Sequence, residues 1–147
     1  MSDLIGIYNN ACAFYDCAQM CIQKADDGQP YEYLRLHTPA LVNCAFSCEL
    51  FLKLLIESVG KDYGKIHDLD KLFSLLPQDM QERINKNTYY KTGMIKDVFG
   101  LPMLKKVANS FNEWRYSFEK RQLSGYIGYL LGLCAVLKDE ADKLYIH

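Results

Sequence analysis

Four stretches of this chain repeat apolar residues at alternating steps of three and four positions. That spacing places side chains on one face of an α-helix, and no stretch alternates with the period of two that is typical of a strand. The pattern therefore predicts an all-α bundle of four long helices. The predicted helices cover residues 4–25, 38–59, 103–118 and 123–144.

The second predicted helix differs from the others because it is apolar on nearly all sides. Thr38 and Pro39 form an N-cap and first-turn signal at its start, and Gly60 follows its end. Its one polar row is Glu49-Lys53-Glu57, at steps of four. A helix that is hydrophobic all round is usually buried, so we expect this one to be the central helix of the bundle.

Short elements are predicted between the second and third long helices. Asp68 can cap a short helix, and Pro77 can both end that helix and open another that reaches about Ile84. Residues 85–100 contain several Asn and Gly residues without clean periodicity, which favours a long connection. We therefore expect a bundle of four long helices plus short ones.

Composition bounds the remaining possibilities. The 147 residues fit a single domain over 1–147, and half of them are apolar with 24% charged, as in ordered globular proteins. A net charge of −1 gives no global attraction to polyanions, so contact with nucleic acid would need a local basic patch. The start of the chain lacks the basic region of a secretory signal, and the longest uncharged apolar stretch, 123–137, is shorter than a membrane span. We expect a cytoplasmic protein with no membrane partner.

Six cysteines in such a compartment are expected to stay reduced. Cys17 and Cys21 lie one helical turn apart, as do Cys44 and Cys48, and antiparallel pairing of the first two helices would bring the four together. Four thiolates can bind zinc, but Cys-x₃-Cys pairs on helices are not the usual spacing, and free cysteines are readily buried. The interpretation is a core role with no metal and no cofactor, and Cys134 is also assigned to the core.

Charged residues within apolar helices are the most informative polar feature. Glu49, Lys53, Arg115 and Glu119 are expected to form a structural polar network, since a buried unpaired charge is costly. Two roles remain open for Arg115. It can pair with Glu49 across two helices, or it can bind phosphate in a cleft. Gly128 and Gly132 also allow a close approach of another helix, either inside the bundle or across a dimer interface.

Three segments together resemble the HEPN family of small helical proteins. They are Glu49-Leu50-Phe51-Leu52-Lys53 in the second helix, His67-Asp68-Leu69 before the short helix, and Trp114-Arg115-Tyr116 with Glu119. The resemblance implies a helical bundle that forms a homodimer and acts on RNA. In the ribonuclease members it implies an Arg followed after four to six residues by a His, facing a cleft between protomers. Cleavage there is metal-independent and uses the RNA 2′-hydroxyl as nucleophile.

The resemblance assigns the family arginine to Arg115 but leaves the family histidine without a match. Lys120, Arg121 and Gln122 stand at the histidine's place, and Lys or Arg does not normally titrate near neutral pH. His67 is the second catalytic candidate if it approaches Arg115. Otherwise it packs over its loop or helps to cap the next helix.

RNA binding is the function that the resemblance favours, in a defence or toxin–antitoxin setting. Arg115 would hold phosphate, and Tyr116 or Trp114 would stack on a base. Lys120 and Arg121 would extend a phosphate track, or they are simply solvated surface. Any catalysis would be that of a metal-independent endoribonuclease, and we expect little or none. The alternative is a noncatalytic scaffold bundle that binds a protein partner.

Overall fold

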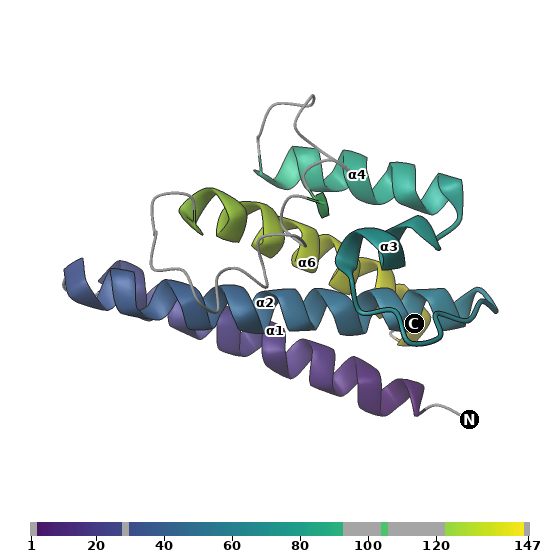
Figure 1. Ribbon diagram of the computed structural model, residues 1–147, viewed down its shortest axis with the longest axis horizontal. Helices are drawn as coiled ribbons and strands as arrows, with labels where there is room; N and C mark the ends of the chain where they lie inside the picture. Colours follow the sequence, from purple (N-terminus) through teal and green to yellow (C-terminus); the bar gives the residue numbers. More distant parts are fainter. Residues whose placement is uncertain (1–2, 28–29, 93–103, 106–122, 146–147) are drawn as a thin grey trace.

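The computed structural model describes residues 3–27, 30–92, 104–105 and 123–145, with side chains described outside 25–34 and 123–126. Every regular element of this described part is a helix, which confirms the all-α prediction (Figure 1). The helices are α1 (Leu4–Asp27), α2 (Pro30–Ser58), α3 (Leu69–Ser74), α4 (Gln78–Thr92) and α6 (Leu123–Tyr145).

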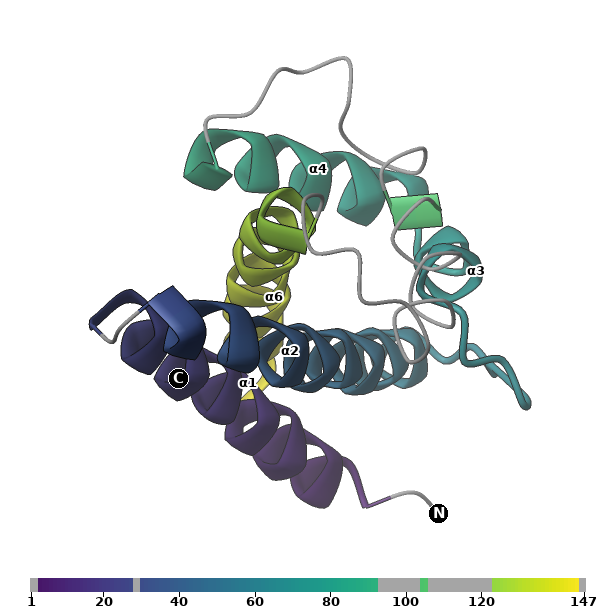
Figure 2. The ribbon, with the colours of Figure 1, turned by 60° about the vertical axis from the view of Figure 1, so that its left-hand side comes forward.

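Helix α2 is central, as its apolar sequence predicts. Its largest contact is with α1, and α6 and α3 also pack against it. Helix α4 lies on α6, away from α1, so α6 is held between α2 and α4 (Figure 2). Of the second helix's apolar residues, Phe51, Leu52 and Leu54 are fully buried. Each such side chain contributes about 1.5–3 kcal/mol when it leaves water.

Helix α2 begins earlier than predicted. The Thr38-Pro39 signal predicted a start there, but the helix runs from Pro30 and includes Pro39 in its interior. An interior proline costs about 3 kcal/mol because it has no N–H and its ring clashes with the preceding turn. Pro39 is on the exposed side of α2, whereas the neighbouring His37 and Ala40 are buried. The burial of His37 and Ala40 on the other face of α2 favours the helical path through the proline.

Helix α4 is also longer than predicted, since the sequence indicated an end near Ile84. Its buried residues are Ile84 and Thr88, one turn apart, and the helix continues to Thr92. The Thr88 hydroxyl donates to the Ile84 carbonyl at 2.7 Å, and the Thr92 hydroxyl donates to the Thr88 carbonyl at 2.9 Å. These bonds satisfy the threonine hydroxyls on the covered face, and burial of Ile84 and Thr88 holds this otherwise polar helix against the bundle. The predicted connection 85–100 was therefore wrong up to Thr92.

The remaining boundaries agree with the sequence. Helix α1 ends at Asp27, and α6 matches the last predicted helix. Asp68 precedes α3 and Pro77 separates α3 from α4, although the Asp68 carboxylate pairs with Lys71 at 3.0 Å and makes no side-chain cap bond. Residue Gly60, with φ of +78°, follows α2 in the left-handed region that favours glycine. The predicted helix at 103–118 lies outside the described residues apart from Leu104 and Lys105.

One helical segment, Arg35–Ser58 of α2, is long and apolar enough to cross a membrane when only length and composition are considered, with a mean hydropathy of 1.6. Within the fold, 61% of its most apolar window is buried. The central helix of a bundle meets the same two criteria, so this segment is weak evidence for a membrane span.

Candidate functional site

A cluster of three polar side chains joins α2 to the loop that precedes α3. The Lys53 Nζ atom donates to Glu49 Oε2 at 3.0 Å, one helical turn apart. The His67 Nδ1 atom lies 3.1 Å from that same Glu49 oxygen and 3.1 Å from Lys53 Nζ. Glu49 and Lys53 are largely covered, with side chains 17% and 13% exposed, whereas His67 is 69% exposed. The cluster therefore exposes an imidazole to solvent, while the charged groups of Glu49 and Lys53 beside it are largely covered.

The tautomer of His67 decides which contact is a hydrogen bond. A protonated Nδ1 donates to the Glu49 carboxylate, whereas an unprotonated Nδ1 accepts from the Lys53 ammonium. When Nδ1 carries the proton and donates it to Glu49, Nε2 is left unprotonated and can accept a hydrogen bond. The same arrangement orients a histidine that acts as a general base in many enzymes.

Lys53 is held from a second direction by Tyr63, in the loop after α2. Its Nζ atom lies 5.2 Å from the centre of the Tyr63 ring, within the range of a cation–π contact. Burial and a hydrogen bond with Glu57 raise the pKa of Tyr63. The polar row Glu49-Lys53-Glu57 therefore faces this loop, and it anchors the loop on α2.

The ring of His67 bonds Glu49 and Lys53, and Asp68 makes no side-chain cap bond at the start of α3. The considered approach of His67 to Arg115 lies outside the described residues. The contact with Glu49 had no sequence signal, because the two residues are separated by a loop whose path the pattern does not specify. Of the predicted polar network, Glu49 and Lys53 are paired. The predicted residues Arg115, Tyr116, Glu119, Lys120 and Arg121 lie outside the described residues, and so does the expected Glu49–Arg115 pair.

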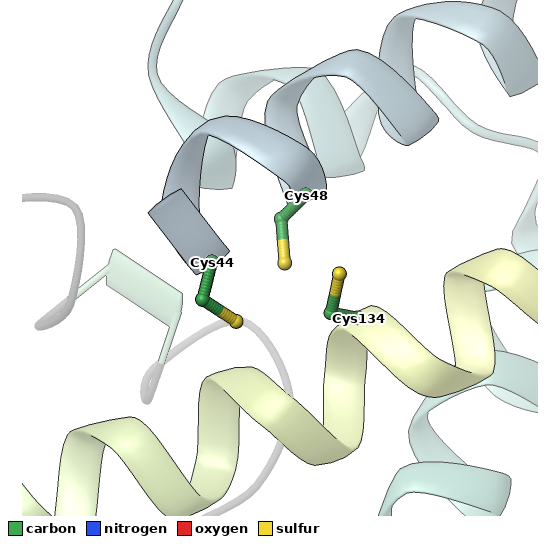
Figure 3. Close-up of side chains that lie close together, drawn as sticks. All are labelled: Cys44, Cys48 and Cys134. Carbon is green, nitrogen blue, oxygen red and sulfur yellow. The ribbon is translucent and has the colours of Figure 1, made fainter. Parts of the chain in front are cut away.

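A second cluster brings three cysteine thiols together in the core, where α2 meets α6. The Sγ atoms of Cys44, Cys48 and Cys134 lie within 4.8 Å of one another, and Figure 3 shows the three side chains converging from the two helices. All three residues are fully buried, whereas Cys17 is exposed and Cys21 is half-buried.

The expected grouping of Cys17, Cys21, Cys44 and Cys48 was therefore wrong. Cys44 and Cys48 belong to a face of α2 that is turned toward α6, so the third sulfur comes from Cys134, 86 positions beyond Cys48. Cysteine spacing along a sequence cannot reveal a partner on a distant helix. The prediction that Cys134 is a core residue is confirmed.

Hydrogen bonds connect this cysteine cluster to Ser47. The Ser47 hydroxyl donates to the Ala11 carbonyl of α1 at 2.6 Å, and the Cys134 thiol donates to that hydroxyl at 3.1 Å. Burial raises the pKa of the Cys48 thiol, and a hydrogen bond with Cys134 raises that of Cys44. Burial also acts to raise the pKa of Cys134, but hydrogen bonds from the neighbouring thiols outweigh it and lower that pKa.

Two polar contacts of α6 with other helices had no signal in the sequence. Arg83 of α4 donates from Nε and Nη2 to the two carboxylate oxygens of Glu140, at 2.6 and 3.1 Å. Burial acts to raise the pKa of Glu140, but Arg83 outweighs it and lowers that pKa. The Tyr8 hydroxyl of α1 donates to Asp142 at 2.5 Å, and Lys138 donates to the same carboxylate at 2.9 Å. The Arg83–Glu140 and Tyr8–Asp142 hydrogen bonds hold α4 and α1 against α6.

The structure thus defines a helical bundle with an exposed Glu49–Lys53–His67 cluster and a separate buried cysteine cluster. No protein-family model, curated protein or solved structure matches this chain.

Proposed function

We propose that this chain is a HEPN-like helical module that binds or processes RNA, in a defence or toxin–antitoxin setting. The observation that carries the proposal is the exposed His67 imidazole beside the Glu49–Lys53 pair. The resemblance at residues 49–53, 67–69 and 114–119 supplies the RNA chemistry. Arg115 is the proposed phosphate ligand, Tyr116 the stacking residue, and Lys120 and Arg121 a phosphate track.

The His67 cluster suits an RNA ligand in its charge and exposure. A carboxylate alone would repel phosphate, but Glu49 is compensated by Lys53 at 3.0 Å, and the solvent-facing group is the imidazole. An imidazole can donate a hydrogen bond to phosphate or exchange a proton near neutral pH. The Lys53 ammonium, 3.1 Å from His67 Nδ1, balances the Glu49 carboxylate and leaves the cluster without net negative charge. The cluster can therefore bind a polyanion, although the whole chain carries a net charge of −1.

Binding is the expected activity, and cleavage is expected to be weak or absent. An arginine that stabilises phosphate supplies only part of the barrier reduction when no proton donor or acceptor is positioned at the reacting oxygens. His67 is the one proposed residue that can take this role. If cleavage occurs, it should be metal-independent.

A homodimer in the cytoplasm is part of the same proposal. Val42 and Phe46 lie one turn apart on α2 and are each 39% exposed. The Phe46 ring meets the Phe14 ring of α1 edge to face, with centroids 4.6 Å apart. Exposed aromatic and aliphatic groups on adjacent helices suit contact with a second copy of the chain.

One observation favours the noncatalytic scaffold as a second candidate. Glu49, Lys53 and His67 already bond one another, so the cluster can have a purely structural role, in which it holds the loop before α3 on α2. In that case RNA would not bind, and the surface would contact a protein partner.

The test is binding of labelled single-stranded RNA, with chelator present and cleavage followed in the same samples. The variants are His67→Ala and Arg115→Ala, and the control is Lys86→Ala, an exposed lysine on α4. We expect wild type and the control to bind equally, and each site variant to bind several-fold more weakly. Affinity should fall as salt rises, because phosphate contacts dominate.

Two outcomes would change the proposal. Robust cleavage that both site variants lose would make His67 a catalytic residue. Absence of RNA binding by the wild-type protein, or binding that both site variants retain, would refute the proposed RNA site and leave the scaffold.

A further inference from the structure

We propose that Cys44, Cys48 and Cys134 bind one soft, thiophilic metal ion through three sulfur ligands, and that Cu(I) is the ion this site fits best. The three sulfurs converge from two helices in the core, within 4.8 Å of one another (Figure 3). This site is separate from the His67 cluster and does not rest on RNA binding.

The spacing of the sulfurs is close to that of a three-coordinate site. Metal–sulfur bonds are about 2.3 Å long, and a trigonal centre with such bonds places its sulfurs roughly 4 Å apart. The observed upper limit of 4.8 Å is within a side-chain adjustment of that value. Because Cys44 and Cys48 lie on adjacent turns of α2 and Cys134 lies opposite on α6, the ion would bridge two helices that already pack together.

The number and type of ligands select the ion. Thiolate sulfur is a soft ligand that favours Cu(I) and zinc, but structural zinc sites take four ligands in a tetrahedron. Among the described residues, these three are the group with metal-ligating atoms this close together. The nearby Ser47 offers only a neutral hydroxyl. A trigonal set of three sulfurs therefore fits Cu(I) better than zinc.

Proton balance limits the charge that enters the core. Cu(I) binding to three thiols with release of two protons leaves two thiolates, one thiol and a net charge of −1. Copper remains Cu(I), so the step consumes no oxidant or reductant. The Ser47 hydroxyl, 3.1 Å from the Cys134 sulfur, can turn from the Ala11 carbonyl to donate to a thiolate there. Such a hydrogen bond offsets part of the cost of burying the charge.

The buried position predicts slow loading. The three cysteines are 0% exposed, so the contact between α2 and α6 must open before the ion enters. Once bound, the ion holds the two helices together, and the loaded protein should unfold at a higher temperature than the metal-free protein.

The test is anaerobic competition for Cu(I) between the reduced full-length protein and a chromophoric Cu(I) chelator. We expect wild type to retain one Cu(I) per chain, and Cys134→Ser to lose affinity at least tenfold. Cys17→Ser, which changes an exposed cysteine, is the control and should retain wild-type affinity. Equal affinity of wild type and Cys134→Ser, or a loss in the Cys17→Ser control, would overturn the proposal.

X-ray absorption of the copper-loaded wild-type protein decides the matter even if Cys134→Ser does not fold. We expect three sulfur neighbours, with the thiol at a longer distance than the two thiolates. Two sulfur neighbours, or copper bound by nitrogen, would overturn the assignment. Parallel competition with Zn(II) tests the ion, since a tighter Zn(II) complex with four ligands would contradict the choice of Cu(I).

Discussion

At the scale of single residues, the polar contacts that matter most join helices far apart in sequence. Glu140 is 5% exposed and accepts two hydrogen bonds from Arg83, which the periodicity of α4 and α6 does not indicate. His67 meets Glu49 through a loop, and Cys134 meets Cys44 and Cys48 across two helices. Sequence spacing identifies pairs within one helix, such as Glu49 and Lys53, but it cannot identify partners that tertiary packing brings together.

Removal of the Glu140 charge tests the ion pair with Arg83. Glu140→Gln should lower the free energy of unfolding by about 1–3 kcal/mol, less than the loss of a fully buried pair because the Arg83 side chain is 41% exposed. The measurement is urea denaturation at neutral pH. Glu82→Gln, an exposed carboxylate in the same helix as Arg83, is the control and should change stability little. Equal effects of the two substitutions would contradict the pairing.

The pKa of Glu140 also predicts how stability changes with pH. Arg83 lowers the folded-state pKa below the ordinary value of 4.5, so Glu140 stabilises the fold fully above that value. This stabilisation should be lost as pH falls below 4.5 and through the folded-state pKa. Denaturation midpoints measured from pH 7 to pH 3 should therefore converge for wild type and Glu140→Gln at low pH. A constant difference across the range would show that the carboxylate charge is not the cause.

At the scale of helices, the sequence predicted existence and type better than boundaries. Apolar periodicity located α1 and α6 closely and identified α2 as the central helix. Periodicity misplaced helix boundaries where local sequence signals disagreed with the helices that the structure shows. The Thr38-Pro39 signal predicted a start that lies inside α2, which begins at Pro30, and the polar sequence of α4 did not indicate its narrow buried stripe.

Substitution of Pro39 tests the interior position directly. Pro39→Ala restores an N–H and removes the ring clash, so it should stabilise the protein by about 1–3 kcal/mol. Thermal unfolding measures the change, and Pro77→Ala, at the boundary between α3 and α4, is the control and should give no such gain. A neutral or destabilising Pro39→Ala would indicate that α2 begins at Thr38-Pro39 after all.

Gly128 and Gly132 of α6 form a matched pair for the packing of α4. A β-carbon on Gly132 would collide with the Thr92 methyl group, and Thr92 cannot turn away without losing its bond to the Thr88 carbonyl. Gly132→Ala should therefore destabilise the protein, although alanine favours helix by about 1 kcal/mol. For Gly128, no described atom lies within 4 Å of such a carbon, so Gly128→Ala should stabilise it. Chemical denaturation compares them, and stabilisation by both would contradict the close contact.

At the scale of the whole molecule, the exposed apolar groups of α1 and α2 favour self-association. We expect a two-fold homodimer by light scattering at micromolar concentration, and we expect Phe46→Ser to weaken it. Val59→Ser, at the C-terminal end of α2 and similarly exposed at 37%, is the control. A monomer at all concentrations would remove the dimer from the proposed function.

We propose above all that the Glu49–Lys53–His67 cluster is part of a surface that binds RNA. The most direct measurement is nuclear magnetic resonance of the His67 ring nitrogens and protons during titration with single-stranded RNA. We expect these resonances to shift and saturate with RNA, and we expect high salt to reverse the change. Unchanged His67 resonances at saturating RNA, or no response of the protein to RNA, would contradict it.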